Sequence, residues 1–445
     1  MSVPDRPTPT DHQQGASEPD YLAEATYAAT RRPVEQAATL LPQAYRSPSF
    51  YELERQQVFA RSWIAVTLAE KVAQPGQVVT ASVAGMPIIV TRDGEGELRA
   101  FHNVCRHRGT QLVADDCALR RFRCPYHSWT YALDGRLLGS PLFEGSDIPA
   151  DQQALFDTSH RRGFDKRDYG LLPVRIAAWG HIVFVNLSEA SPPLDEWLGD
   201  LPDRLAGYRL DESVAVGELS YDVRANWKLV AENFMEYYHL PWVHPELAKV
   251  SRVEDHHRFQ GPGMYTGTCT TPISQDPSTS GWLSLPSTPG LDDDDAISGR
   301  FLWVTPNLAI AVLPTHTFTI IVTPDGPDRT REQTVLSLHR DVAADADASA
   351  LVDLTRFWDH LNREDIDIVE RGQLGVSSDA FPGGPMCYRF EEPLHRFQNM
   401  IIDRMVGIDR IPEGDPRGDT SIVTASSPAA GSTRTGPDRS VGARA

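Results

Sequence analysis

Two short cysteine–histidine pairs constrain the fold of this chain more than any other feature of its sequence. One residue separates Cys105 from His107, two separate Cys124 from His127, and 16 residues lie between His107 and Cys124. Each pair places a thiolate and an imidazole on a tight turn, so both pairs can reach one metal centre. Two thiolates on one iron and two neutral imidazoles on the other hold one class of [2Fe–2S] cluster. The pattern therefore predicts two turns that converge at the tip of a small domain.

A structural zinc site is the alternative for these four residues. Tetrahedral sites with two cysteines and two histidines are common, but zinc motifs usually pair Cys with Cys and His with His. Cys117, between the two pairs, is expected to be a small buried hydrophobic residue. The odd total of five cysteines is untypical of a disulfide framework and indicates a reducing cytoplasm.

The sequence around the pairs has the pattern of an antiparallel β domain. Residues 77–83 and 86–91 are β-rich runs, and turn signals follow at Asp93 and Asp134. We therefore expect a small all-β domain over residues 63–184.

From residue 185 onward the pattern changes to helices and longer strands. Residues 227–238 and 351–373 are each predicted to form a helix, and residues 301–322 to form two joined strands. These elements predict a larger domain over residues 185–412, in which helices pack on an antiparallel sheet. The fold class is thus α+β.

The two ends of the chain differ in composition from its body. Residues 1–33 are rich in Pro, Thr, Ala and acidic residues, and residues 413–445 in Gly, Ser, Thr, Pro and Arg. Both tails are predicted to be disordered, since such compositions offer little apolar surface to bury. Residues 34–62 are expected to pack on the larger domain.

The composition argues against two classes of partner. The formal net charge is −19, whereas a nucleic-acid-binding protein usually carries a positively charged surface. A membrane span needs about 18 or more consecutive apolar residues, and the sequence has no such run. It also lacks the pattern of a secretory signal, so we expect a cytoplasmic protein.

A second group of potential metal ligands lies in the larger domain. Glu236 and His239 are three residues apart, a spacing that places both on one helical face. Pro241 is expected to kink or end that helix, so that His244 turns back toward His239. One carboxylate from elsewhere would complete a site with two histidines and one carboxylate, which leaves open positions on Fe(II).

Three acidic residues of the second predicted helix could supply this carboxylate. They are Glu364, Asp365 and Asp367, and we favour Asp365. The structural alternative is an acidic helix face in contact with solvent, together with two ordinary histidines. The co-occurrence of this group with the cysteine–histidine pairs favours the metal site.

These motifs resemble those of one family, the α subunits of Rieske non-haem iron oxygenases. Residues 103–109 and 124–131 closely resemble the family's cluster loops, and residues 226–245 resemble the segment that opens its catalytic domain. Thr305–Asn307 and residues 364–373 fit later landmarks. The resemblance covers residues 40–412 and implies a Rieske domain followed by a helix-grip-like catalytic domain.

The resemblance also implies a role for each site residue. Cys105 and Cys124 would bind one cluster iron, His107 and His127 the other, and His239, His244 and Asp365 the mononuclear iron. Trp129 would pack on the cluster, and Asn233 would lie near the mononuclear iron. Glu236 occupies the position of the acid that links a cluster histidine of one subunit to an iron-ligand histidine of its neighbour.

The expected activity follows from this family. The enzyme would use O2, and electrons from NAD(P)H delivered by a flavin- or ferredoxin-type reductase, to hydroxylate or demethylate a small organic substrate. Glu at position 236 is similar to the carnitine-type oxygenases and favours a quaternary ammonium substrate; aromatic ring dioxygenation and aromatic O-demethylation are the alternatives. A homotrimer, or a multiple of it, is expected, with electron transfer between subunits.

Two further expectations concern the pocket and a competing class of protein. Tyr265, Phe301, Trp303 and Phe318 are candidates for the pocket wall, where aromatic faces could hold a trimethylammonium group. A simple electron carrier needs only a domain of about 100 residues. Such a carrier would leave the second group of ligands unexplained.

Overall fold

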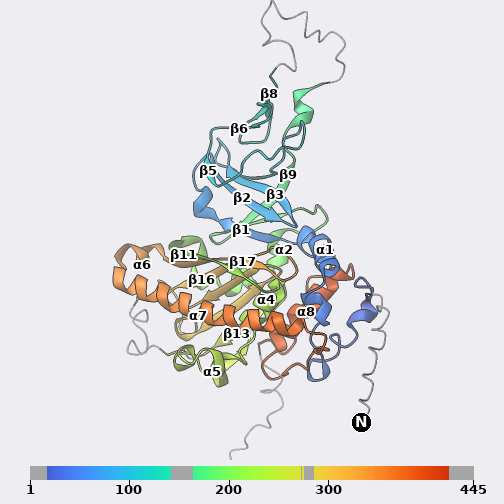
Figure 1. Cartoon of the computed structure of the whole chain (residues 1–445). Helices are drawn as coiled ribbons and strands as arrows, with labels where there is room; N and C mark the ends of the chain where they lie inside the picture. Colours follow the sequence, from blue (N-terminus) through green and yellow to red (C-terminus); the bar gives the residue numbers. More distant parts are fainter. Residues whose placement is uncertain (1–17, 142–163, 272, 275–284, 420–445) are drawn as a thin grey trace, which may run out of the picture.

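Two seven-stranded antiparallel sheets, consecutive along the chain, form the framework of the protein (Figure 1). The computed structural model describes residues 18–141, 164–271, 273–274 and 285–419. The α+β class predicted from the sequence is confirmed, with a small β region followed by a larger sheet that carries helices.

The first sheet has the strand order β1-β10-β9-β4-β3-β2-β5, and a three-stranded sheet β6-β7-β8 extends it. The strands are β1 (Ile64–Leu68), β2 (Gln77–Val83), β3 (Met86–Arg92), β4 (Leu98–His102), β5 (Cys117–Ala118), β6 (Phe122–Arg123), β7 (Thr130–Tyr131), β8 (Leu137–Gly139), β9 (Pro173–Trp179) and β10 (Ile182–Asn186).

The two β-rich runs of the sequence form the β2–β3 hairpin. Its turn residues Ala84 and Gly85 have φ angles of 51° and 75°, as a tight hairpin turn requires. The expectation that Cys117 is buried is wrong, because the short strand β5 leaves it exposed at the sheet edge.

The second sheet has the order β11-β17-β16-β15-β14-β13-β12. Its strands are β11 (Ser213–Val223), β12 (His256–Arg258), β13 (Tyr265–Thr270), β14 (Gly299–Val304), β15 (Leu308–Val312), β16 (Thr317–Pro324) and β17 (Thr330–His339). The sequence predicted two strands in the region of β14 to β16, and the structure has three. A turn at Thr305–Asn307 reverses the chain and adds the extra hairpin.

Three helices pack on this second sheet and carry the residues of interest. They are α4 (Trp227–Met235), which contacts β13, β14 and β16; α7 (Ala348–Val376), which crosses the sheet beside α4; and α8 (Glu392–Met405). The remaining α-helices are α1 (Pro48–Gln57), α2 (Leu194–Leu198), α3 (Leu201–Arg204), α5 (Leu240–Val243) and α6 (Arg340–Asp345). Among the described helices, none combines the length and apolar composition that a membrane span requires.

A buried ion pair fixes α4 against the N-terminal segment. Lys228 Nζ lies 2.7 Å from Glu54 Oε1 of α1, and both side chains have no exposed surface. Glu232, one turn further along α4, accepts hydrogen bonds from Tyr45 and Gln398. A buried ion pair persists only when its geometry and its other hydrogen bonds offset the cost of desolvation. Residues 34–62 thus contribute directly to the position of α4.

The prediction of disordered tails is wrong for the described part of both tails. Tyr21 and Tyr27 are buried in the main core, and Arg31 lies 2.7 Å from Asp403 of α8. At the other end, Asp415 lies 3.0 Å from the buried Arg258. The prediction failed because it was based on the average composition of each tail, which is polar, and a few side chains anchor the described part. The remainder of the two tails, residues 1–17 and 420–445, lies outside the described residues.

Two candidate metal centres

The two cysteine–histidine pairs lie on loops that share one backbone pattern. The N–H of Cys105 donates to the carbonyl of Thr110, and that of Cys124 donates to the carbonyl of Trp129. In each loop the cysteine carbonyl accepts from the N–H four residues on, at Gly109 and Ser128. These two residues have φ angles of 74° and 58°, in the left-handed region where a turn can close. The local sequence therefore builds two equivalent turns.

The side chains of the two loops converge. The His107 and His127 rings lie 4.8 Å apart, and the two cysteines interact directly, so that each alters the pKa of the other. Both cysteines are buried, whereas His127 is exposed. Trp129 stacks on His107 at 5.0 Å and 8°. The sulfur side of the site thus faces the core, and the imidazole side faces the surface.

Hydrogen bonds favour a thiolate at Cys124. Burial raises the pKa of both thiols, and it dominates at Cys105. At Cys124 burial is outweighed by the N–H groups of His127 and Tyr126, which lower the pKa of the thiol. The Tyr131 hydroxyl lies 3.3 Å from the Cys105 sulfur and accepts the N–H of Arg106 at 3.0 Å. Two thiol ligands opposite two imidazoles fit a [2Fe–2S] cluster with mixed ligands.

The second candidate centre begins where α4 ends, and not where Pro241 was expected to end it. Helix α4 stops at Met235, and Glu236 is extended, with ψ 153°. Pro241 instead lies in the first turn of the new helix α5, a position where proline is favoured because its missing N–H is not needed. The prediction that Glu236 and His239 share a helical face is therefore wrong, although the bend still brings the two side chains together.

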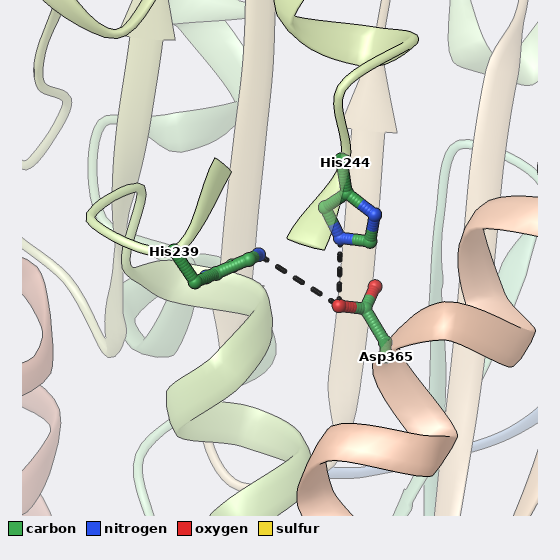
Figure 2. A group of neighbouring side chains, drawn as sticks. All are labelled: His239, His244 and Asp365. Carbon is green, nitrogen blue, oxygen red and sulfur yellow. Dashed lines mark hydrogen bonds and ion pairs between the residues drawn. The ribbon is translucent and has the colours of Figure 1, made fainter. Parts of the chain in front are cut away.

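Three side chains point toward one position, as Figure 2 shows. His244 Nε2 lies 2.8 Å from Asp365 Oδ1, and His239 Nε2 lies 3.7 Å from the same oxygen. These ligand atoms all lie within 4.8 Å of one another, close enough to hold one metal ion. Two imidazole nitrogens and one carboxylate oxygen fit Fe(II) and leave part of its coordination sphere open.

Further contacts orient each of these three groups. Glu236 Oε1 contacts His239 Nδ1, and Glu364 Oε2 lies 2.9 Å from His244 Nδ1. Each imidazole therefore has its Nδ1 held by a carboxylate and its Nε2 directed at the candidate centre, as is common for metal-ligating histidines. Asn233 Nδ2 donates to Asp365 Oδ1 at 2.6 Å.

The three acidic residues left open by the sequence now have different environments. Asp365 faces the histidines, and Glu364 supports His244 from behind. Asp367 pairs with Arg371 at 2.8 Å on the exposed side of α7. The supporting contact of Glu364 was not predicted, because sequence spacing shows which face of α7 a residue occupies but not which side chain faces it.

A cavity adjoins the second centre, and its wall is aromatic and acidic. Phe301 and Phe318 line it as predicted, whereas Tyr265 and Trp303 do not. Tyr265 donates to Asp200 instead, and Trp303 donates to the carbonyl of Pro306. Tyr237 and Trp358 were missed as lining residues. The helical spacing of Trp358, seven residues before Asp365, is the signal that could have found it. Among the described residues that line the cavity, none is lysine or arginine.

Two family models match the chain. Residues 62–149 match the Rieske [2Fe-2S] domain, and residues 210–407 match the ring hydroxylating alpha subunit (catalytic domain). The chain is 30% identical over 404 residues to the glycine betaine monooxygenase oxygenase subunit of Chromohalobacter salexigens, covering 82% of this chain and 86% of that protein. It is 25% identical over 371 residues to the chloroplastic choline monooxygenase of Spinacia oleracea, covering 82% and 78%.

Solved structures of two kinds of oxygenase share the fold. The quaternary ammonium Rieske monooxygenase CntA in complex with L-carnitine has a TM-score of 0.68 at 24% identity, covering 83% of this chain and 96% of that one. Naphthalene 1,2-dioxygenase from Rhodococcus sp., bound to indole, has a TM-score of 0.68 at 19% identity, covering 87% and 100%. The fold alone does not choose between these two kinds of substrate.

Proposed function

The chain belongs to the Rieske non-haem iron oxygenases, and from that membership we propose that it oxidises a quaternary ammonium compound. As a member, it is an oxidoreductase with a [2Fe–2S] cluster and a mononuclear iron. The observation that carries the choice of substrate is the cavity, which combines aromatic walls with carboxylates and has no lysine or arginine among its described lining residues. Such a wall favours a cation. Two of the relatives are named for glycine betaine and choline, which are quaternary ammonium compounds.

We propose a ligand set for each metal centre. Cys105, Cys124, His107 and His127 would hold the cluster, and His239, His244 and Asp365 the mononuclear iron. The two equivalent turns support the first assignment. The convergence of the three ligand atoms supports the second. We assign the cluster domain to residues 63–184 and the catalytic domain to residues 185–412; the first sheet runs two residues past this boundary, because β10 ends at Asn186.

The bound groups supply single electrons from the cluster and an open iron face at which O2 can be reduced. The chain's own residues prepare this site. Glu236 and Glu364 each hold an imidazole by its Nδ1, so the tautomer with Nε2 free for metal is stabilised. Asn233 donates to Asp365 and so orients that carboxylate. The aromatic wall holds the substrate beside the ligands and limits the entry of water.

The positions of the two centres support a role for more than one copy of the chain. The three-stranded sheet beside the cysteine loops lies at one end of the molecule, and α5 beside His239 and His244 lies at the other (Figure 1). Near Glu236 the surface carries exposed aromatic side chains, with Trp242 79% and Tyr238 49% exposed. We propose that this surface receives the cluster loops of a neighbouring copy in a homotrimer or a multiple of it. Inter-subunit electron transfer has been described for CntA.

The proposal includes the remaining partners. A flavin- or ferredoxin-type reductase would deliver two electrons from NAD(P)H, in the cytoplasm. One atom of O2 would enter a C–H bond of the substrate, and the other would leave as water with two protons. Oxidation of an N-methyl group in this way releases formaldehyde and the demethylated amine.

Substrate-dependent turnover tests this function. The reconstituted holoenzyme would be supplied with NADH and a surrogate reductase, and O2 uptake and product mass would be followed. We expect coupled O2 uptake with choline or glycine betaine, and little with naphthalene or with 3,3-dimethylbutan-1-ol, the uncharged isostere of choline. Turnover of naphthalene or the uncharged alcohol, without turnover of either quaternary ammonium compound, would overturn the proposal.

A further inference from the structure

Asn362 lies between the substrate cavity and a buried carboxylate. It is one turn before Asp365 on α7, it lines the cavity, and it is 5% exposed. Behind it lies Glu332 of β17, which is 4% exposed and borders no part of the cavity. A polar group at this depth requires a hydrogen-bond partner. The partner therefore fixes how Asn362 is presented to a ligand.

The hydrogen bond between the two residues orients the amide. Asn362 Nδ2 donates to Glu332 Oε2 at 2.8 Å. Burial raises the pKa of Glu332 to about 7. Above that pH the carboxylate is ionised and can only accept, so the nitrogen of the amide must face it. The amide oxygen then lies on the other side of the group, where it can accept a hydrogen bond from a ligand.

The charge around the cavity also favours a ligand with no negative group. Fe(II) would bring two positive charges, but three carboxylates, Asp365, Glu236 and Glu364, surround the ligand histidines. Burial lowers the pKa of His256 in the cavity wall to about 4, so this imidazole is neutral near pH 7. No lysine or arginine is present among the described lining residues. A ligand carboxylate would therefore meet acceptors and like charges.

We infer that Asn362, oriented by Glu332, is a specificity-determining residue that selects a quaternary ammonium alcohol over a zwitterionic quaternary ammonium carboxylate. The amide oxygen accepts the hydroxyl hydrogen of the substrate, and the aromatic wall holds its trimethylammonium group. Glu332 acts as a positioning residue, because it reaches the substrate only through Asn362. This inference rests on the proposed function and names its substrate more closely.

Ligand binding to the holoenzyme at pH 8.5 tests the inference, with affinities measured by calorimetry. Choline is expected to bind at least about tenfold more tightly than glycine betaine. Asn362→Leu should lower the affinity for choline about tenfold, because one hydrogen bond to a buried group is lost. The affinity for tetramethylammonium, which has no hydroxyl, should stay within about twofold. Circular dichroism and iron content would show that the variant is folded and loaded.

A matched pair of variants separates the positioning role of Glu332 from a merely structural one. Gln at this position still offers an acceptor to Asn362 but can also donate, so Glu332→Gln should keep a reduced preference for choline. Glu332→Leu offers no acceptor and should lose the preference for choline, while tetramethylammonium still binds. The inference is overturned if glycine betaine binds as tightly as choline, or if Asn362→Leu weakens choline and tetramethylammonium equally. Failure of the proposed function has a different signature, in which 3,3-dimethylbutan-1-ol binds as well as choline.

Discussion

The two candidate centres differ in how the chain builds them. The cysteine–histidine pairs lie on two turns within 23 residues, from Cys105 to His127, and each turn is closed by its own backbone hydrogen bonds. The second centre joins the bend after α4 to a helix that lies more than 100 residues further along the chain, and it depends on packing between α4 and α7. The first centre is therefore prepared by local structure, and the second by tertiary structure. The two should respond separately to mutation.

The largest effect is expected from removing a proposed cluster ligand. Cys124→Ala should abolish cluster binding and all coupled turnover, because an alanine cannot bind iron. The mononuclear site should keep its iron, since none of its ligands lies near the loops. Visible absorption, EPR of the reduced sample and metal analysis would check this. Loss of both centres in a folded variant would show that they do not form independently.

A second substitution tests the dependence of the mononuclear site on packing. Lys228→Met leaves Glu54 as a buried carboxylate without its ion-pair partner, a change that costs about 3–5 kcal/mol of unfolding free energy. Denaturant titration should show this loss, and iron should leave the mononuclear site more readily while the cluster spectrum is kept. Lys71→Met is the matched control, because Lys71 pairs with Glu218 at the surface and should matter little. Equal stability of the two variants would contradict the role given to the buried pair.

A third substitution tests Glu236, the acid near the proposed contact between copies of the chain. Glu236→Gln should keep both metals but lower coupled turnover about 100-fold, since a carboxylate that supports a metal-bound histidine typically contributes 10–100-fold. Steady-state O2 uptake and product yield would measure the effect. Unchanged turnover with full metal content would remove Glu236 from the mechanism.

The smallest expected effect separates two neighbouring acids on α7. Glu364→Gln should weaken retention of the mononuclear iron about tenfold, because the contact with His244 Nδ1 changes while the ligands remain. Asp367→Asn should have no effect, because Asp367 pairs with Arg371 on the exposed face. The two variants would be compared by the amount of iron that each loses during dialysis against a chelator. The reverse order of effects would mean that the ligand helix is rotated from its position in the structure.

The same contrast explains what the sequence could and could not predict. The cluster loops were predictable because spacing and turn residues determine a local structure, and α7 was predictable from its long apolar periodicity. The support of His244 by Glu364 was not predictable, because that contact depends on how α7 packs beside α4 and the bend that follows it. Pro241 was misjudged because proline disfavours a helix interior but favours a helix start. Residues 18–33 were wrongly predicted to be disordered, because their average composition is polar although two of their tyrosines are buried in the core.

Mixed oligomers test most directly whether two separate metal centres on this chain work together between copies. Chains with Cys124→Ala and chains with Asp365→Ala, each inactive alone, would be co-expressed with different affinity tags and purified through both tags in turn. We predict that the mixed oligomers regain substrate-dependent O2 uptake, because the cluster of one chain can serve the mononuclear iron of the next. Mixed oligomers that contain both kinds of metal centre and remain inactive would contradict this arrangement.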